Sequence, residues 1–507
     1  MAMQRPFLIA LDQGTTSSRA IVFRHDGSLF GATAFEFPQH YPQPGWVEHN
    51  PDDLVDSTVR ALREAIAKAG VSPGQVAAIG ITNQRETTLI WEREGGRPVG
   101  NAIVWQCRRT APLIQRLKRE GLAPLIREKT GLVPDAYFSA SKIRWMLDEY
   151  GLQARAENGE LCFGTVDSYL AFHLVAGRPH VTDATNASRT MLFNLKDQDW
   201  DSELLRIFNI PRAMLPRVVD SAFEIGSLNP DILGGPVKVA ALAGDQHAAL
   251  FGQGCLSPGA VKNTYGTGCF MLMNTGDTPV ISDKGLLTTM AWRVKGKPVF
   301  ALEGSVFAAG AAIQWLRDEL GIIASSSQSE ELALKVKDSG GVHFVPAFTG
   351  MGAPHWNMYA RGMMTGLTRG TSRHHLARAA LESIAFQSDD LLRLMGDTLG
   401  QAPAALRADG GASANNLLMQ LQADISGIRV LRPRVQETTA LGAAMLAGLA
   451  VGLYPDEAAA AKPWQADETA FLPSISGEER AQARGGWERA VGAALHWAKD
   501  SEQGRTE

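Results

Sequence analysis

The sequence has few cysteines and almost no net charge, and each shortage argues against a class of protein. Only four of its 507 residues are cysteines (Cys107, Cys162, Cys255 and Cys269), and no two of them form a CxxC pair. This spacing favours neither a structural zinc site nor a disulfide framework, and it fits a reducing cytoplasm. The formal net charge of -4 at pH 7 gives no electrostatic reason to expect nucleic acid or an acidic membrane as a partner.

Long apolar runs are also missing. The most apolar later segment, residues 440–454, is rich in alanine and glycine and is shorter than the roughly 20 residues that a membrane-spanning helix needs. We predict that it is a buried helix and expect no membrane insertion. The N-terminal residues lack the cleavage site and the apolar length of a secretory signal peptide, which favours the same cytoplasmic location.

Several common catalytic motifs do not occur. The sequence has no GxxxxGK[ST] phosphate loop, no HExxH zinc motif and no GxSxG nucleophile motif. Two of the three serine β-lactamase motifs are present, SxxK at Ser139 to Lys142 and KTG at residues 129–131, but SDN is absent and the order is reversed. We therefore interpret Lys142 as a surface residue of a helix predicted over residues 139–150.

What the sequence does contain is the composition of an ordinary globular protein, with 45% hydrophobic and 20% charged residues. The chain is too long for one hydrophobic core, which predicts two large units. A helix is expected directly after Asn50, where a proline and two acidic residues follow a capping residue. Buried strands are predicted at residues 7–11, 20–23, 76–82, 101–105 and 237–242. Strands and helices in this order predict an α/β fold.

The first two predicted strands form a β-hairpin with the features of a phosphate-binding turn. Its connection, residues 12–18, supplies a glycine that lets a ligand approach the backbone and a run of hydroxyl groups that can donate to phosphate. Asp12 in this turn could hold a magnesium ion through water. The local pattern also fits an ordinary hairpin with a polar turn. The candidate phosphate contacts are Gly14, Thr15, Thr16, Ser17 and Arg19.

The same plan of strand, Gly/Thr turn and strand returns at residues 261–273, where Thr267 lies between two glycines. This repeat predicts a duplicated domain, with one copy over residues 1–255 and the other over residues 256–507. Coincidence is the alternative, because GTG turns are common.

Further elements are predicted in the second half of the chain. A helix predicted over residues 305–320 places Gly310 and Gln314 on one face. A strand over residues 405–409 is followed by two glycines and a helix that begins at Ser413.

Polar residues follow three of the predicted strands. Asp12 and Gln13 lie in the first hairpin, residues 83–86 follow the strand at 76–82, and Asp245 and Gln246 follow the strand at 237–242. Polar groups at strand ends commonly line the ligand cleft of an α/β fold.

Eight segments of the sequence match the motifs of one protein family, in the same order along the chain. They are ALDQGTTSSRAIVF at 10–23, GITNQRETT at 80–88, VWQCRRTA at 104–111, residues 137–149, TNASRTMLFN at 185–194, GDQHAALFGQ at 244–253, KNTYGTGCFMLMNTG at 262–276 and DGGASANN at 409–416. With these segments the chain resembles the FGGY family of carbohydrate kinases, and in particular its members that phosphorylate glycerol. The likeness covers residues 7–454.

This resemblance implies a fold and an activity. The fold is two actin-like (ribonuclease H-like) α/β domains of related topology, with the active site in the cleft between them. The activity is transfer of the terminal phosphoryl group of ATP to a primary hydroxyl of glycerol, with Mg²⁺, as in an ATP:glycerol 3-phosphotransferase of glycerol catabolism. It also implies a homodimer or homotetramer.

The matched segments assign roles to individual residues, as implications of the resemblance. Asp245 is the general base that takes the proton from the attacking hydroxyl, and Asp12, the rival for that role, is the carboxylate for Mg²⁺. The glycerol contacts are Arg85, Glu86, Trp105, Tyr137, Asp245, Gln246 and Phe270. The polyphosphate contacts are Gly14, Thr15, Thr16, Ser17, Arg19 and Thr267, and the nucleotide contacts are Gly310, Gln314, Gly411 and Asn415.

Three alternatives stay open. The chain could phosphorylate another small polyol, triose or ketose, or it could be an actin-like ATPase that gates a protein partner. Arg85 and Glu86 could form only a mutual ion pair, because they are adjacent and opposite in charge. Some bacterial members of the family bind a sugar bisphosphate at a Gly-Gly-Thr-Arg loop, but residues 234–238 read GGPVK here, so the resemblance does not extend to that effector site.

Overall fold

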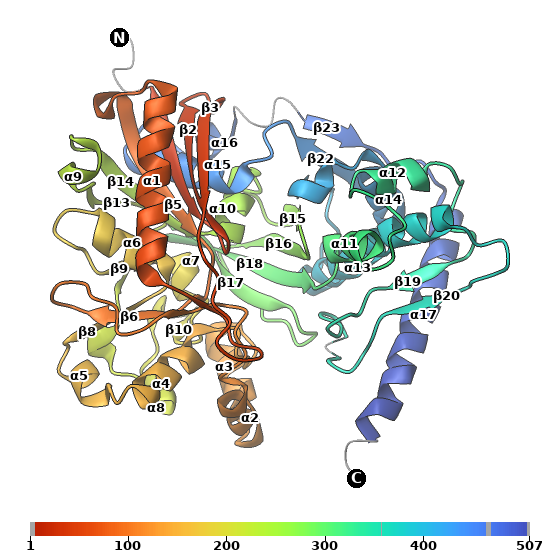
Figure 1. The fold of residues 1–507 in the computed structure, drawn as a ribbon, viewed down its shortest axis with the longest axis horizontal. Coiled ribbons are helices and arrows are strands. Elements are labelled where there is room, and N and C mark those ends of the chain that lie inside the picture. The colour runs from red at the N-terminus through yellow and green to blue at the C-terminus, as the bar shows by residue number, and fades with distance from the viewer. Residues whose placement is uncertain (1–5, 356, 463–467, 504–507) are drawn as a thin grey trace.

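The computed structural model describes residues 6–355, 357–462 and 468–503, the last five of them by backbone only. The chain forms two halves, each built on its own sheet, that lie side by side (Figure 1). In the part of the chain that the structure describes, none of the helices combines the length and the apolar character needed to cross a bilayer.

The N-terminal half is built on a six-stranded sheet. Its strands are β1 (Phe7–Gln13), β2 (Ser17–Arg24), β3 (Leu29–Glu36), β5 (Val76–Asn83), β13 (Ala222–Ser227) and β14 (Lys238–Gly244). Their order is β13-β14-β5-β1-β2-β3, in which β1, β2 and β3 are antiparallel and β5 and β14 run parallel to β1. Both β1 and β5 are buried along their whole length, as expected for central strands whose two faces are covered.

The C-terminal half repeats this plan in a seven-stranded sheet. Its strands are β15 (Val261–Tyr265), β16 (Cys269–Gly276), β17 (Leu287–Val294), β18 (Lys297–Val306), β21 (Ala405–Asp409), β22 (Arg429–Pro433) and β23 (Glu468–Phe471). Antiparallel strands β15, β16 and β18 correspond to β1, β2 and β3, while β21 and β22 continue in parallel as β5 and β14 do. The predicted fold class, two α/β units of related topology, is confirmed.

Helices and short strands complete each half. In the N-terminal half the helices are α1 (Pro51–Ala69), α2 (Ala111–Arg119), α3 (Ala123–Thr130), α4 (Ser139–Glu149), α5 (Gln153–Glu157), α6 (Val166–Leu174), α7 (Ala184–Ala187), α8 (Ser202–Phe208), α9 (Pro230–Leu233) and α10 (Asp245–Gly252). The short strands there pair as β4 (Glu48–His49) with β7 (Ala102–Ile103), β6 (Leu89–Glu92) with β8 (Leu161–Gly164), β9 (Val181–Asp183) with β12 (Arg217–Val219) and β10 (Phe193–Asn194) with β11 (Asp199–Trp200).

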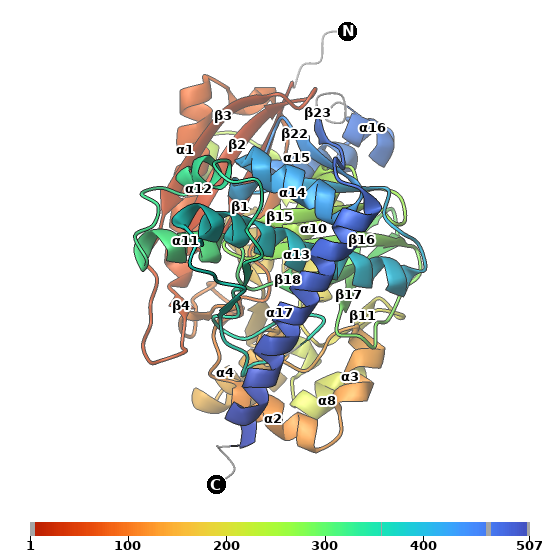
Figure 2. The same ribbon diagram turned by 90° about the vertical axis from the view of Figure 1, so that its right-hand side faces the viewer.

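The C-terminal half has fewer additional elements. They are α11 (Gly310–Asp318), α12 (Gln328–Ala333), α13 (Arg373–Leu399), α14 (Asn416–Ser426), α15 (Thr438–Ala450), α16 (Glu457–Ala461), α17 (Gly477–Gln503) and the paired strands β19 (His343–Val345) and β20 (Met363–Thr365). Three short 3-10 turns are η1 (Pro73–Gln75), η2 (Arg212–Met214) and η3 (Gly411–Ala414). Figure 2 shows α17 crossing the outer face of this half.

Several predicted boundaries differ from the structure. The turn of the first hairpin is shorter than predicted, because β1 continues to Gln13 and β2 already begins at Ser17. Helix α11 begins at Gly310, not at residue 305, because the strand before it continues through Ser305 in register with β16. The helix predicted from Ser413 begins at Asn416, after the 3-10 turn η3.

The interpretation of Lys142 as a surface residue is wrong. Its side chain lies on the inner face of α4 and is fully buried. Sequence pattern could not distinguish this face, because serines and a lysine alternate with apolar residues on both sides of the helix.

Helix α15 packs on the sheet of the opposite half. It is buried almost throughout, which confirms the predicted buried helix. A Cβ on Gly442 would collide with the carbonyl oxygen of Ala248 in α10, and one on Gly80 of β5 would collide with that of Ala443. These glycines let α15 lie directly against α10 and β5, so one shared core contains side chains of both halves, for example Leu8 and Leu272.

We expect Gly442→Ala to lower the free energy of unfolding by about 3 kcal/mol, because the added methyl group meets rigid backbone and forces the two helices apart. Chemical unfolding in urea measures the change.

The matched control is Gly492→Ala in α17, where a Cβ would meet nothing within 4 Å. Because alanine favours a helix, this variant should be as stable as the wild type or up to about 1 kcal/mol more stable. Equal stability of Gly442→Ala and the wild type would contradict the close packing of α15 on α10.

Candidate active site

Polar residues meet at the carboxyl ends of three adjacent parallel strands. Gln13 of β1 lies opposite Asn83 of β5, and Asn83 in turn lies opposite Gly244 of β14. The structure therefore brings together the three polar groups predicted from the sequence, since Asp12 precedes Gln13 and Asp245 follows Gly244. Ligands of open α/β sheets bind at this edge.

The turn of the first hairpin is held by its neighbours. Gly14 donates its N–H to the carbonyl of Ser17 at 2.9 Å, and the side-chain amide of Gln84 donates to the carbonyl of Gly14 at 3.1 Å. The indole N–H of Trp105 donates to Oγ1 of Thr15 at 3.0 Å. Thr16 at the tip is exposed. The turn is thus fixed from one side and open at its tip, as a phosphate-binding turn needs to be.

Arg19 links this hairpin to the C-terminal half. Its guanidinium contacts Oδ2 of Asp12 at 2.5 Å and Oε2 of Glu437 at 2.7 Å, and it is about one third exposed. Glu437 directly precedes α15. A phosphate group at the turn would therefore share Arg19 with these two carboxylates.

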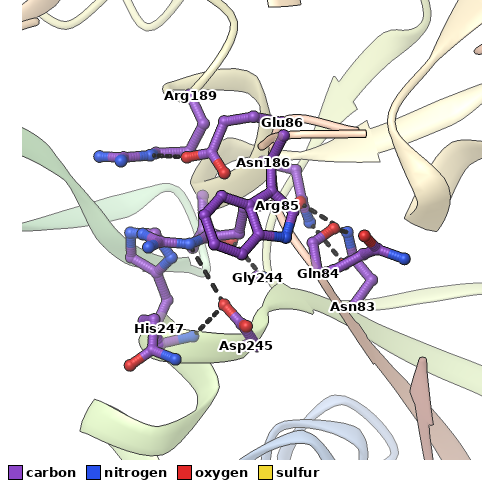
Figure 3. A network of polar contacts seen from close by, with 12 residues as sticks. Asn83, Gln84, Arg85, Glu86, Asn186, Arg189, Gly244, Asp245 and His247 are labelled. Atoms are coloured by element: carbon purple, nitrogen blue, oxygen red, sulfur yellow. Dashed lines mark hydrogen bonds and ion pairs between the residues drawn. The ribbon is translucent and has the colours of Figure 1, made fainter. Parts of the chain in front are cut away.

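Behind the strand ends lies a chain of buried charges (Figure 3). Arg85 contacts Oδ1 of Asp245 through Nε at 3.2 Å and binds both carboxylate oxygens of Glu303, at 2.5 and 3.1 Å. Arg189 donates to Glu303 at 3.0 Å and to Glu86 at 2.6 Å. The side chains of Arg85, Arg189, Glu86 and Glu303 are at most 2% exposed.

The proposed mutual ion pair of Arg85 and Glu86 does not form. These adjacent side chains pair with different partners, Arg85 with Asp245 and Glu303, and Glu86 with Arg189. The chain of charges thus runs from Asp245 to Glu86 through two arginines and Glu303.

Glu303 joins the two halves in this chain of charges, since it lies on β18 whereas both arginines belong to the N-terminal half. Burial raises the pKa of Glu303, but the guanidinium groups of Arg189 and Arg85 outweigh burial and hold the pKa well below its usual range. Sequence reasoning missed Glu303 and Arg189. The signal for Glu303 is a single carboxylate directly after the apolar run at residues 299–302, and Arg189 lies inside the matched segment 185–194.

Asp245 lies at the first residue of α10, at the edge of this chain. Its side chain is 31% exposed, and Oδ1 accepts the N–H of Gln246 at 2.7 Å. Burial raises the pKa of Asp245, the charge of Asp12 raises it further, and Arg85 and the Gln246 N–H lower it, with a net increase. Asp245 therefore combines partial exposure with a raised pKa, which suits a group that accepts a proton.

Aromatic side chains lie beside these polar groups. The rings of Trp105 and Tyr137 meet edge to face with their centroids 5.7 Å apart. On the other half, Phe270 shares its face of the sheet with Glu303 and Lys262, because paired residues and every second residue of a strand point to one face. Lys262 donates to Oε1 of Gln246 at 2.5 Å, so this face adjoins α10.

Two of the predicted nucleotide residues, Gly310 and Gly411, lie near the carboxyl ends of β15 and β21. Gly310 donates its N–H to the carbonyl of Gly266 at 2.9 Å, so the start of α11 lies against the second hairpin turn that carries Thr267. A Cβ on Gly410 would lie 2.5 Å from the carbonyl oxygen of Tyr265, which places Gly411 beside the same strand end.

The other two predicted nucleotide contacts lie in different environments. Gln314 is exposed one turn further along α11, and Asn415 uses its side-chain oxygen to cap α14 through the N–H of Leu418 at 2.8 Å.

Comparisons with known proteins give one consistent result. Sequence models of the FGGY family of carbohydrate kinases match residues 7–252 (N-terminal domain) and 261–451 (C-terminal domain). The chain is 56% identical over 494 residues to glycerol kinase 2 of Thermotoga maritima, covering 97% of this chain and 99% of that protein. It is 55% identical to the glycerol kinase of Symbiobacterium thermophilum, covering 98% and 100%.

Solved structures agree with the sequence comparisons. The crystal structure of Plasmodium falciparum glycerol kinase with ADP superimposes with a TM-score of 0.91 at 33% identity, covering 96% of this chain and 98% of that one. Xylulose kinase from Lactobacillus acidophilus shares the fold, with a TM-score of 0.86 at 24% identity and coverage of 97% and 98%.

We expect Glu303→Gln to lower the free energy of unfolding by about 4 kcal/mol at neutral pH, because it leaves two buried guanidinium groups without their shared carboxylate. Because the pKa of Glu303 is held below its ordinary value of 4.5, its contribution is complete above that pH and is lost as the pH falls below it. The variant should therefore lose less stability than the wild type between about pH 5 and pH 3.

Urea midpoints across this pH range test both expectations. The control is Glu224→Gln, which removes an exposed ion pair to Lys238 and should change stability by less than about 1 kcal/mol. If both variants are equally stable at neutral pH, Glu303 does not hold the two halves as described.

Proposed function

The chain belongs to the FGGY family of carbohydrate kinases, and we propose that it transfers the terminal phosphoryl group of ATP to glycerol, giving sn-glycerol 3-phosphate and ADP. In this proposal it is an ATP:glycerol 3-phosphotransferase. The observation that carries the proposal is the position of Asp245, which lies at the same edge of the sheet as the turn of the first hairpin and at one end of the chain of buried charges. Relatives named glycerol kinase at 55 to 56% identity support the choice of glycerol.

Glycerol would bind where the chain of charges reaches the strand ends. Arg85, Glu86, Tyr137, Asp245 and Gln246 offer donors and acceptors for three hydroxyl groups, and Trp105 and Phe270 supply apolar surface for the carbon atoms. A site of this kind rejects molecules that lack a hydroxyl, because the rejected molecule leaves buried polar groups unpaired.

The attacking hydroxyl would give its proton to Asp245. The carboxylate is partly exposed and its pKa is raised, so it can accept a proton while Arg85 and the Gln246 N–H fix its orientation. Asp12 is the weaker candidate, because its side chain is only 8% exposed and pairs with Arg19 at 2.5 Å, whereas the side chain of Asp245 is 31% exposed and its contact with Arg85 is longer, at 3.2 Å.

ATP would lie between the two hairpin turns. Its phosphates would contact Gly14, Thr15, Thr16, Ser17, Arg19 and Thr267. Its nucleoside would lie near Gly310, Gln314, Gly411 and Asn415, where the glycines allow close approach. Positioning of this kind supplies most of what phosphoryl transfer needs.

Asp12 is the residue that would hold Mg²⁺. In the part of the chain that the structure describes, no cluster of three or more potential metal-ligating side chains occurs. That fits a magnesium ion bound by one carboxylate, water and the phosphates of the substrate. When bound, the ion supplies positive charge that neutralises the phosphate oxygens.

The alternative functions have less support. A kinase for another polyol, triose or ketose would share the fold, as the xylulose kinases do, but the chain is only 24% identical to the one compared above. An actin-like ATPase that gates a partner would have no need of the charged side chains of Arg85, Glu86 and Asp245. The division into residues 1–255 and 256–507, the homodimer or homotetramer and the cytoplasmic location stay predictions.

The test is ADP release with ATP and Mg²⁺, with and without glycerol, dihydroxyacetone, erythritol and xylulose. We expect the strongest stimulation by glycerol, and a loss of about a hundred- to ten-thousand-fold in kcat for Asp245→Asn. Because the pKa of Asp245 is raised, the acidic limb of the kcat/KM profile should lie above the ordinary aspartate value of 3.8.

The control for this experiment is Asp56→Asn, on the exposed face of α1, which should retain wild-type rates. Failure of glycerol to stimulate ADP release would overturn the proposed function, whereas full activity of Asp245→Asn would overturn only the choice of base.

We expect Asp12→Asn to raise the Mg²⁺ concentration needed for half-maximal activity by about tenfold or more, because it removes a carboxylate from the metal site. Activity measured across a magnesium titration shows the change. Glu437→Gln is the control, since it also frees Arg19 but leaves Asp12 in place. Equal magnesium dependence of both variants would mean that Asp12 acts through Arg19 and not through the metal.

A further inference from the structure

Lys142 is a buried cation that the proposed mechanism does not use. It lies on α4, it is fully buried, and its ammonium donates to two backbone carbonyls, that of Tyr137 at 2.6 Å and that of Glu86 at 3.0 Å. Among the residues that the structure describes, no carboxylate forms an ion pair with it. A charged group in this position needs a reason, because burial of a cation without a counter-ion is costly.

The carbonyl that Lys142 binds belongs to a strained turn. Glu86 has a φ of 61°, in the left-handed region that residues with side chains rarely adopt. The N–H of Thr87 donates to the carbonyl of Arg85 at 2.8 Å, so Arg85, Glu86 and Thr87 form a three-residue γ-turn with positive φ at its centre. Such a conformation is strained and persists only where neighbours hold it.

Three side chains hold this turn through one atom. The carbonyl oxygen of Glu86 accepts from Lys142 at 3.0 Å, from Oγ1 of Thr88 at 3.0 Å and from Oγ of Ser139 at 3.3 Å. Lys142 is the only charged donor of the three, and a charged donor makes the strongest of these hydrogen bonds.

The turn determines where two proposed glycerol contacts lie. Its first two residues send their side chains to different partners: Arg85 contacts Asp245, and Glu86 contacts Arg189 (Figure 3). Arg85 also pairs with Glu303. The second carbonyl bound by Lys142 belongs to Tyr137, a third proposed contact. One ammonium group therefore fixes the backbone at two points from which three contacts project.

The charge of Lys142 is not fully compensated. Burial lowers the pKa of Lys142 to about 7, Glu86, Cys107 and Asp135 raise it, and Arg108 lowers it. An apolar side chain of similar shape would fill the same space without the free-energy cost of burying a charge. The presence of lysine therefore indicates a role beyond packing.

We propose that Lys142 is a positioning residue of the glycerol site: it holds the Arg85-Glu86-Thr87 turn and the Tyr137 backbone in the arrangement that binds the polyol. The inference rests on the proposed function, since it names a determinant of the same site. It predicts a defect in polyol binding and none in nucleotide binding, because both carbonyls lie on the substrate side of the site and neither belongs to a residue proposed to contact ATP.

The experiment compares Lys142→Met with the wild type. Methionine has nearly the shape of lysine but cannot donate, so two buried carbonyls lose a partner. We expect the KM for glycerol to rise by about tenfold or more, and the KM for ATP to stay within about twofold of the wild-type value. Loss of general stability would instead move both KM values together or lower only the amount of active enzyme.

Two further variants complete the test. Thr88→Val removes a neutral donor to the same carbonyl and should raise the KM for glycerol by a smaller factor. It also tests the proposal if Lys142→Met does not fold. Lys68→Met is the control, because Lys68 is exposed on α1, far from the site, and forms an ion pair with Glu64 one turn away.

The proposal is overturned if folded Lys142→Met has an unchanged KM for glycerol. It is also overturned if the KM for glycerol and the KM for ATP change equally in this variant. If Lys142→Met does not fold, the comparison of the two KM values is made in Thr88→Val. Failure of the proposed function is seen separately, in the wild type. If the wild type phosphorylates a different polyol, the same comparison applies to the KM for that polyol.

Discussion

The contact on which the site depends is the carboxylate of Glu303 between the guanidinium groups of Arg85 and Arg189. Glu303 comes from one half of the chain and the arginines from the other, and all three are buried. Buried charges are stable only when paired and hydrogen-bonded, so the two halves are held in one relative position near this point. That position places Asp245 and Gln246 of the N-terminal half against Lys262 of the C-terminal half.

Close packing of helices acts together with this charge contact. Helices α10 and α15 meet through glycines, each close to the backbone of the other helix, so their separation is set by backbone atoms. Both helices begin at the site: α10 with Asp245, and α15 directly after Glu437, the partner of Arg19. Movement of one half relative to the other would therefore change the surroundings of Asp245 and of Arg19 together.

The sequence predicted the features that are encoded locally. The two hairpins, the cap of α1 and the polar residues at strand ends follow from patterns within a few residues, and the structure contains all of them. It did not predict the roles of Glu303 and Arg189, because their partners are far away in the chain and no local pattern indicates which carboxylate meets which arginine. The burial of Lys142 was missed because it depends on the distant turn at Glu86. The start of α11 was misplaced for a related reason: pairing with β16, a tertiary contact, extends the strand through Ser305.

The buried polar groups explain why such a site can be selective. An apolar pocket discriminates only weakly against a similar molecule that carries an extra hydroxyl. A site of buried polar groups discriminates strongly against a molecule that lacks a hydroxyl, because each polar group left unpaired costs binding free energy. Here Arg189 binds Glu303 through Nη2, and Nε2 of His247 contacts Oγ1 of Thr289. The other nitrogen of each side chain, Nη1 of Arg189 and Nδ1 of His247, is buried without a hydrogen-bond partner among the described residues. Because Arg189 binds both Glu303 and Glu86, the orientation of Glu86, a proposed glycerol contact, depends on this buried network.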